Sequence, residues 1–139
     1  MRETKDFEIL RGDIYYVDFG KAPGSAIRGK RPAIVIQNDM GNKHSPTLIV
    51  AAITSGDRKK DLPTHLCVEE RFGLTKKSIV LLEHIQTIDK SCATEFVGHI
   101  DDKKFMRAVD EALEISIGLR KPKKKLRKKT PPQTKVSWG

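Results

Sequence analysis

The sequence predicts a mainly β domain, either a small antiparallel β-barrel or a strongly bent sheet, closed by one C-terminal helix. Three observations lead to this prediction. Five or six short segments rich in β-branched and aromatic residues follow one another between residues 11 and 100. Turn residues separate these segments, and no helical pattern lies between them, which disfavours alternating strands and helices. Beyond residue 101 the apolar residues take on the spacing of a helix.

The first half of the chain contains three of the expected strands. The first covers residues 11–19, RGDIYYVDF, and a loop with three glycines follows over residues 20–31. The second, PAIVIQ at 32–37, is a nearly continuous apolar run, as expected for a strand buried on both faces. Turn residues at 38–46 lead to another apolar strand, TLIVAAIT at 47–54.

The second half adds shorter strands and the helix. After a charged loop at 55–63, strands are expected at 64–69, at 78–88 and, with a weaker pattern, at 94–100. The helix is expected over 102–119, with Asp101 or Asp102 as the N-cap that accepts hydrogen bonds from the first free N–H groups. Its apolar residues lie three or four positions apart, at Phe105, Val109, Ala112, Leu113 and Ile117.

The positive charge is confined to one end of the chain. The 139 residues include 27 Lys or Arg and 18 Asp or Glu, for a net charge of +9. Residues 1–119 carry 18 of each sign, whereas residues 120–139 carry nine basic residues and no acidic one. We therefore expect a formally neutral domain at 1–119 and a disordered basic tail at 120–139. The tail is either an RNA- or ribosome-binding tether or a solvated extension without a role.

Composition also excludes several classes of protein. No apolar run approaches the roughly 20 residues needed to cross a bilayer, and the charged N-terminus lacks the apolar stretch of a signal peptide. Two cysteines, Cys67 and Cys92, do not make a disulfide framework or a metal site. We expect a soluble, cytoplasmic protein without a membrane partner. No HxH, HExxH or clustered carboxylate motif occurs, so neither a metal nor a cofactor is expected.

Several segments carry a family resemblance when they are read in order. They are RGDIYYVDF, GSAIRGKRPAIVIQND, SPTLIVAAIT, LPTH and SIVLLEHIQTIDK, followed by DEALEISIGL. Together they resemble the MazF/PemK-like toxin endoribonucleases from about residue 10 to residue 119. The resemblance implies an SH3-like β-barrel of the MazF/CcdB/Kid type that forms a homodimer. It also implies metal-independent cleavage of single-stranded RNA at a short sequence, in mRNA and possibly rRNA. The products would be 2′,3′-cyclic phosphate and 5′-hydroxyl ends, and translation and growth would be inhibited.

The same resemblance implies the partners of the protein. A cognate antitoxin would occupy the RNA groove, and the complex of the two proteins would bind the operator DNA. Two alternatives remain open. In the first, the chain is a noncatalytic nucleic-acid-binding module of SH3-like fold. In the second, it is a DNA-binding co-repressor that acts only with an antitoxin.

Arg31 and Thr54 are the candidate catalytic pair. Arg31 ends the glycine-containing loop at the start of a buried strand, and its guanidinium presents a planar fork of donors that matches two phosphate oxygens. Thr54 closes the strand 47–54, and its hydroxyl can donate to a phosphate oxygen or orient the 2′-hydroxyl. The plain alternatives are a solvated loop arginine and a threonine chosen for its β propensity. The resemblance assigns both residues to catalysis.

The loop before Arg31 departs from the family. Many relatives have Glu-Gln after the Gly-Ser pair, and that Glu is a proposed base in some of them, whereas this chain has Ala26 and Ile27. A base is then dispensable, or another group serves. Ser25 can still offer its hydroxyl or backbone N–H to the phosphate.

A wider set of polar residues is predicted to contact RNA. His65 follows the loop after Thr54, and His84 stands where relatives more often have Gln. Gln86 replaces a residue that is commonly basic in relatives. The alternative explanation for each histidine is ordinary packing, and for Asn42 it is a purely structural role in the turn. The predicted RNA-binding residues are Ser25, Arg28, Asn42, Arg58, Lys59, His65, Glu83, His84, Gln86 and Thr87.

Overall fold

The computed structural model describes residues 8–21, 27–56 and 62–122. In this part of the chain, six strands form one antiparallel sheet in the order β4-β5-β3-β2-β1-β6. The strands are β1 (Asp13–Asp18), β2 (Lys30–Val35), β3 (Thr47–Ser55), β4 (His65–Val68), β5 (Ser78–Asp89) and β6 (Ala93–His99). The other elements are the helices α1 (Asp39–His44) and α2 (Lys103–Ser116) and the 3-10 turn η1 (Lys90–Cys92).

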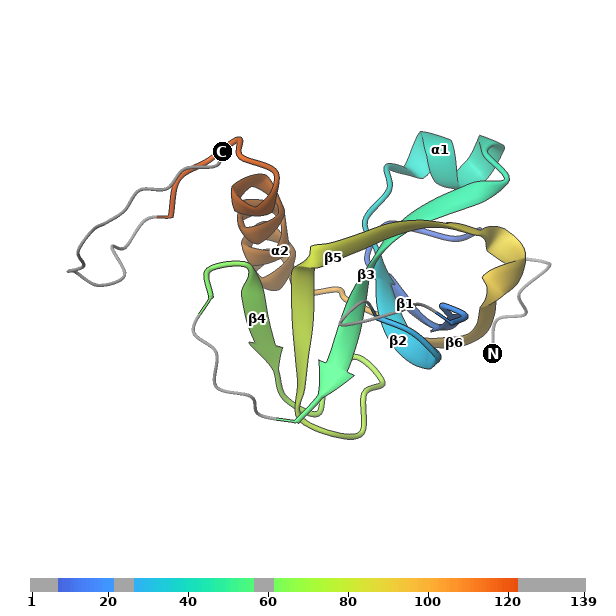
Figure 1. The fold of residues 1–139 in the computed structure, drawn as a ribbon, viewed down its shortest axis with the longest axis horizontal. Helices are drawn as coiled ribbons and strands as arrows, with labels where there is room; N and C mark the ends of the chain where they lie inside the picture. The colour runs from blue at the N-terminus through green and yellow to red at the C-terminus, as the bar shows by residue number, and fades with distance from the viewer. Residues whose placement is uncertain (1–7, 22–26, 57–61, 123–139) are drawn as a thin grey trace.

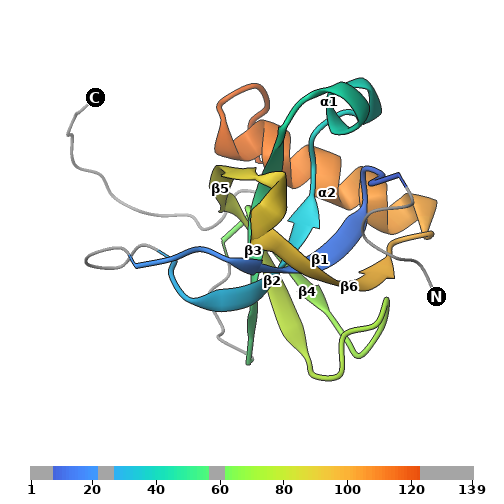
Figure 2. The same ribbon diagram turned by 90° about the vertical axis from the view of Figure 1, so that its right-hand side faces the viewer.

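The sheet bends sharply at the middle of β5. Ala51 of β3 faces Ile85 and Ile53 faces Val80, so a step of two residues along β3 matches a step of five along β5. The surplus residues form a bulge, which increases local twist and bends the strand. Figure 1 shows β5 passing from the part beside β4 and α2 to the part beside α1. The strands accordingly change direction across the sheet between β4 and β6 (Figure 2).

The bend separates two apolar cores. The first lies between the sheet and α2 and includes Ile34, Ile53, Leu82 and Val109, all fully buried. The second lies inside the curled part of the sheet and contains Tyr15, Val17, Phe19, Ala33, Val35, Leu48, Val50, Ala52 and Ile88. In β2 and β3, adjacent residues alternate between the two cores, as sheet geometry requires. Both faces of these central strands are therefore buried, as their continuous apolar runs predict.

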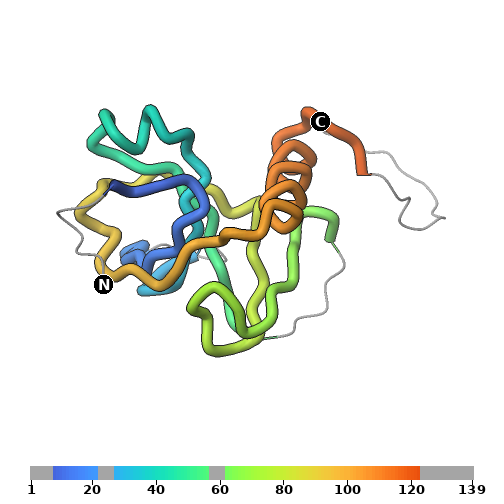
Figure 3. The backbone as a smooth tube through the Cα atoms, turned by 180° about the vertical axis from the view of Figure 1, so that it is seen from behind, coloured from blue at the N-terminus to red at the C-terminus, as the bar shows by residue number. Residues whose placement is uncertain are grey.

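Helix α2 packs beside the β4–β5 part of the sheet and lies away from α1 (Figure 3). Asp102 is its N-cap, because the carboxylate accepts hydrogen bonds from the N–H groups of Lys104 and Phe105. A hydrogen bond from Arg71, together with these N–H groups, lowers the pKa of Asp102. The N-cap prediction is confirmed, and the helix ends at Ser116, just before Gly118 at φ 82°.

Most of the predicted elements are confirmed, with two differences. The turn residues at 38–46 form the short helix α1, which Asn38 caps by accepting a hydrogen bond from the Gly41 N–H. Strand β2 begins at Lys30, inside the predicted loop, because Lys30 and Arg31 pair with Asp18 and Val17 of β1. The described residues contain no helix that is long and apolar enough to cross a membrane. Only residues 120–122 of the basic tail are described, so its disorder and its role stay predictions.

Candidate active site

The sheet register brings Arg31 and Thr54 to the same place. The paired residues of β2 and β3 end with Ala33 opposite Ala52, and Arg31 and Thr54 each lie two residues beyond this pair, at the same end of the two strands. Side chains two positions apart in a strand share a face, so both project on the side of Ala33 and Ala52. Two residues from separate strands can therefore act on one phosphate group.

Arg31 retains most of its hydrogen-bonding capacity. Its Nε donates to the backbone carbonyl of Arg28 at 3.0 Å, which orients the guanidinium. No carboxylate within the described ranges forms an ion pair with it. Two backbone hydrogen bonds close the preceding hairpin, one from the Phe19 N–H to the Gly29 carbonyl and one from the Gly29 N–H to the Gly20 carbonyl. The half-buried arginine thus starts β2 with its terminal N–H groups open to an anion.

The face that carries Thr54 continues across β5 to β4. Thr54 opposes Ile79, and Ile79 opposes Cys67, so these residues extend the row that begins at Arg31. One pair further along, Leu81 opposes His65. The intervening residues Leu66, Val68, Val80 and Leu82 pack into the core under α2, which fixes the direction of this face. Cys67 is exposed in this row, whereas Ile79 and Leu81 are buried. We call the row formed by Arg31, Thr54, Ile79, Cys67, Leu81 and His65 the catalytic face.

A polar cluster lies at the β4 end of the catalytic face. Glu83 accepts hydrogen bonds from Thr64 and His65, each at 2.8 Å, and His84 Nε2 lies 3.9 Å from the same carboxylate. Partial burial raises the pKa of Glu83, but the hydrogen bonds from His65 and Thr64 outweigh this effect and lower it overall. Glu83 is therefore ionised at neutral pH. His65 Nδ1 is buried and has no hydrogen-bond partner among the described residues.

His65 and Thr54 belong to different parts of the catalytic face. Two strand spacings and two residues separate them, which corresponds to about 12 Å between their Cα atoms. His65 is thus too far away to share the phosphate held between Arg31 and Thr54. The predicted RNA residues Gln86 and Thr87 are exposed on the other half of β5, opposite Val50 and Ile49.

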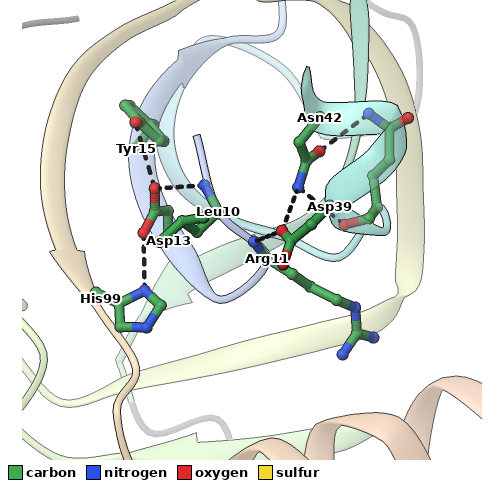
Figure 4. A network of polar contacts seen from close by, with 8 residues as sticks. Leu10, Arg11, Asp13, Tyr15, Asp39, Asn42 and His99 are labelled. Atoms are coloured by element: carbon green, nitrogen blue, oxygen red, sulfur yellow. Dashed lines mark hydrogen bonds and ion pairs between the residues drawn. The ribbon is translucent and has the colours of Figure 1, made fainter. Parts of the chain in front are cut away.

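Asn42 occupies a structural position. It is 2% exposed, and its side chain accepts from Gln37 Nε2 and donates to the Gln37 carbonyl and to Asp39. Figure 4 shows these bonds between α1 and the chain before it. The geometry favours the turn role of Asn42 over an RNA contact. Arg28 is exposed beside Arg31, whereas Ser25, Arg58 and Lys59 lie outside the described residues.

Sequence reasoning missed a second polar network, at the RGD segment. Asp13 is fully buried, and its carboxylate accepts from the Leu10 N–H, from the Tyr15 hydroxyl and from His99 (Figure 4). Arg11 Nε donates to the Ile36 carbonyl, and its guanidinium pairs with Asp110 of α2. The sign of this buried network in the sequence is Asp13, a charged residue within an otherwise apolar strand. No three His, Cys, Asp or Glu side chains gather into a metal-binding group in the described ranges.

Solved structures share this fold. An endoribonuclease from Mycobacterial species, in complex with its cognate antitoxin, aligns with a TM-score of 0.68 at 24% sequence identity. The alignment covers 82% of this chain and 99% of that one. MazF from Deinococcus radiodurans aligns with a TM-score of 0.68 at 21% identity, over 81% and 99% of the two chains. The predicted fold class, a β-barrel with a C-terminal helix, is confirmed.

Sequence comparison identifies the family. The endoribonuclease EndoA of Bacillus subtilis is 49% identical over 112 residues, which make up 80% of this chain and 96% of that protein. The endoribonuclease MazF of Staphylococcus epidermidis is 47% identical over 112 residues, or 80% and 92% of the two chains. A sequence profile described as PemK-like, MazF-like toxin of type II toxin-antitoxin system matches residues 10–117. The chain belongs to this family of toxins.

Proposed function

We propose that this toxin is a sequence-specific endoribonuclease that cuts single-stranded RNA on the catalytic face. The family membership and the names of the two curated relatives support the reaction class. The place of Arg31 and Thr54, each two residues beyond the Ala33–Ala52 pair at the same end of β2 and β3, is the observation that supports the assignment of the site. A guanidinium fork beside a hydroxyl is suited to a phosphodiester and gives no advantage to a protein that only binds base edges.

The proposed reaction is an internal transfer. The 2′-oxygen attacks the adjacent phosphorus and forms a new P–O bond, while the bond from phosphorus to the 5′-oxygen of the next nucleotide breaks. The 2′-hydroxyl loses one proton and the leaving oxygen gains one, so the products are a 2′,3′-cyclic phosphate and a 5′-hydroxyl. Arg31 stabilises the charge that grows on the phosphorus-bound oxygens, and Thr54 donates its hydroxyl to the same group. Arginine is not a realistic base, because a guanidinium group stays protonated in proteins.

The remaining polar residues are assigned to RNA recognition. The carboxylate of Glu83 and the rings of His65 and His84 can bind the edges of unstacked bases about 12 Å from the cut. Arg28 is exposed beside Arg31, and Gln86 and Thr87 are exposed on the other half of β5, so we assign them to RNA contacts beyond this cluster. Ser25, Arg58 and Lys59 remain predicted contacts on the basis of sequence.

The partners follow from the same proposal. A cognate antitoxin blocks the RNA surface, and in its presence the complex binds operator DNA. The toxin works as a homodimer in the cytoplasm on mRNA, with rRNA as a second target. The competing function is a noncatalytic RNA-binding module, which would hold RNA on the same face without cutting it.

Cleavage in EDTA separates the enzyme from the binding module. Purified protein is incubated with a long single-stranded RNA, and both new ends are mapped and tested for 5′-hydroxyl and cyclic phosphate. We expect cuts at one short motif, and a loss of about 10²- to 10³-fold in rate for Arg31→Ala. Arg107→Ala, which removes an exposed arginine from α2, is the matched control. RNA that the wild type binds but leaves intact would contradict the nuclease proposal.

A further inference from the structure

A pocket opens at the rim of the sheet, next to Arg31. Its volume is about 470 Å³, and it lies where β2 begins, β3 ends and β5 begins. Pro32 and Ile53 line it, and these residues alternate along their strands with Arg31 and Thr54. Neighbouring residues of a strand point to opposite faces, so the pocket lies across the rim from the catalytic face. Arg31 also lines the pocket, which makes the two sites adjacent.

The pocket combines cationic groups with an exposed aromatic ring. Lys30 and Lys76 line it, and neither forms an ion pair within the described part of the chain. Tyr16 of β1 is 41% exposed there, an unusual position for a large ring beside a core. Glu95 is the one carboxylate among the lining residues. Two lysines beside an exposed ring provide phosphate contacts and a stacking surface for a base.

The wall that carries Lys76 is held rigidly. Phe72 and Gly73 both have positive φ, and a Cβ atom on Gly73 would collide with the carbonyl of Val97 on β6. A Cβ atom on Gly98 would collide with the Phe72 carbonyl in the same way. The Phe72 ring stacks on Phe105 of α2 with the ring centroids 5.5 Å apart. The pocket is thus preformed, which reduces the ordering cost of binding.

We propose that this pocket binds a nucleotide of the RNA substrate that flanks the scissile phosphate. The base stacks on Tyr16, and Lys30 and Lys76 contact the phosphates on either side of it. The inference rests on the proposed function, because it takes RNA as the substrate of the adjacent catalytic face. An acidic protein segment would also be attracted to the lysines, but it would have no base to stack on the exposed ring of Tyr16.

RNA affinity tests the pocket independently of cleavage. Each variant is made in a Thr54→Val background, in which we expect cleavage to be about 10²-fold slower, and binding of a long single-stranded RNA is followed by fluorescence anisotropy. Tyr16→Ala should weaken binding about tenfold, since stacking on an aromatic ring accounts for an effect of this order. Tyr16→Phe keeps the ring and should bind like the parent. Equal affinities for Tyr16→Ala and the parent would overturn the proposal.

The lysines are tested through the salt dependence of binding. Lys30→Ala combined with Lys76→Ala should flatten the log–log salt slope by about 0.7 for each phosphate that is no longer neutralised. Lys103→Ala combined with Lys104→Ala removes the same charge from exposed positions of α2 and should leave the slope closer to the parent value. Equal slopes for the two double variants would overturn the pocket assignment, as would weakened antitoxin binding with unchanged RNA affinity. A wild type that binds RNA without cutting it would contradict the proposed function alone, because these affinities remain measurable.

Discussion

Two polar clusters on the same sheet use their side chains in opposite ways. Around Asp13 and Asn42, the polar groups are buried and bonded to other groups of the protein (Figure 4). On the catalytic face, Arg31 uses one N–H group internally, and its terminal N–H groups have no partner within the described residues. Buried polar groups that are fully bonded maintain a fold, whereas open ones are available to a ligand. Substitutions in the two clusters should therefore separate stability from activity.

Among substitutions on the catalytic face, Thr54→Val should separate activity from stability most clearly. Valine keeps the β-branched shape and removes only the hydroxyl, so the sheet should keep its stability. We expect the cleavage rate to fall about 10²-fold, as when one preorganised donor to a developing anion is removed. Steady-state cleavage and thermal unfolding are measured together. Thr94→Val, at an exposed position of β6, serves as the control, and an undiminished rate in Thr54→Val would remove Thr54 from the mechanism.

Asp13→Ala should have the reverse effect. It leaves the Leu10 N–H, the Tyr15 hydroxyl and His99 without their shared acceptor. The free energy of unfolding should fall by about 3 kcal/mol, because three donors lose their shared acceptor and each such loss costs about 1 kcal/mol. Cleavage per folded molecule should be unchanged. Asp101→Ala, at an exposed position before α2, is the control for denaturant unfolding. A stable but inactive Asp13→Ala protein would place this network in the active site instead.

The contrast between the clusters also explains what the sequence could and could not predict. The apolar runs at 32–37 and 47–54 predicted the central strands, because a strand that is buried on both faces consists almost entirely of apolar residues. Arg31 and Thr54 were found through family motifs, and their juxtaposition follows from the register of β2 and β3. The pocket around Tyr16, Lys30 and Lys76 carried no sequence signal, since its lining residues come from five separate segments of the chain. The same holds for the bond between Asp13 and His99, which lie 86 positions apart.

Asn42→Ala tests whether this side chain stabilises the fold or contacts RNA. Its loss removes three hydrogen bonds, two with Gln37 and one with Asp39, so the free energy of unfolding should fall by about 1–2 kcal/mol. RNA affinity should be unchanged, because the side chain is buried away from the catalytic face. Denaturant unfolding and RNA anisotropy are measured on one preparation. Weakened RNA binding with unchanged stability would instead support the contact predicted from sequence.

Glu83→Gln should produce the smallest change, visible as a difference in pH dependence. The hydrogen bonds from His65 and Thr64 hold the pKa of Glu83 below its ordinary 4.5 in the folded state. The unfolded chain therefore takes up a proton at a higher pH than the native one does. The resulting stabilisation is complete above about pH 5 and is lost as the pH falls through the native pKa.

Glutamine at position 83 does not titrate, so the stability of Glu83→Gln should fall less steeply than that of the wild type between pH 5 and 3. The difference should stay below about 1 kcal/mol, because the carboxylate is partly exposed and solvent screens its partners. Denaturant unfolding is measured across this range beside Glu70→Gln, an exposed position with no ion pair in the described chain. Parallel pH profiles for the wild type and Glu83→Gln would show that the Thr64–His65–Glu83 bonds do not hold the carboxylate in solution. The side chains at the β4 end of the catalytic face would then be ordered only when RNA binds.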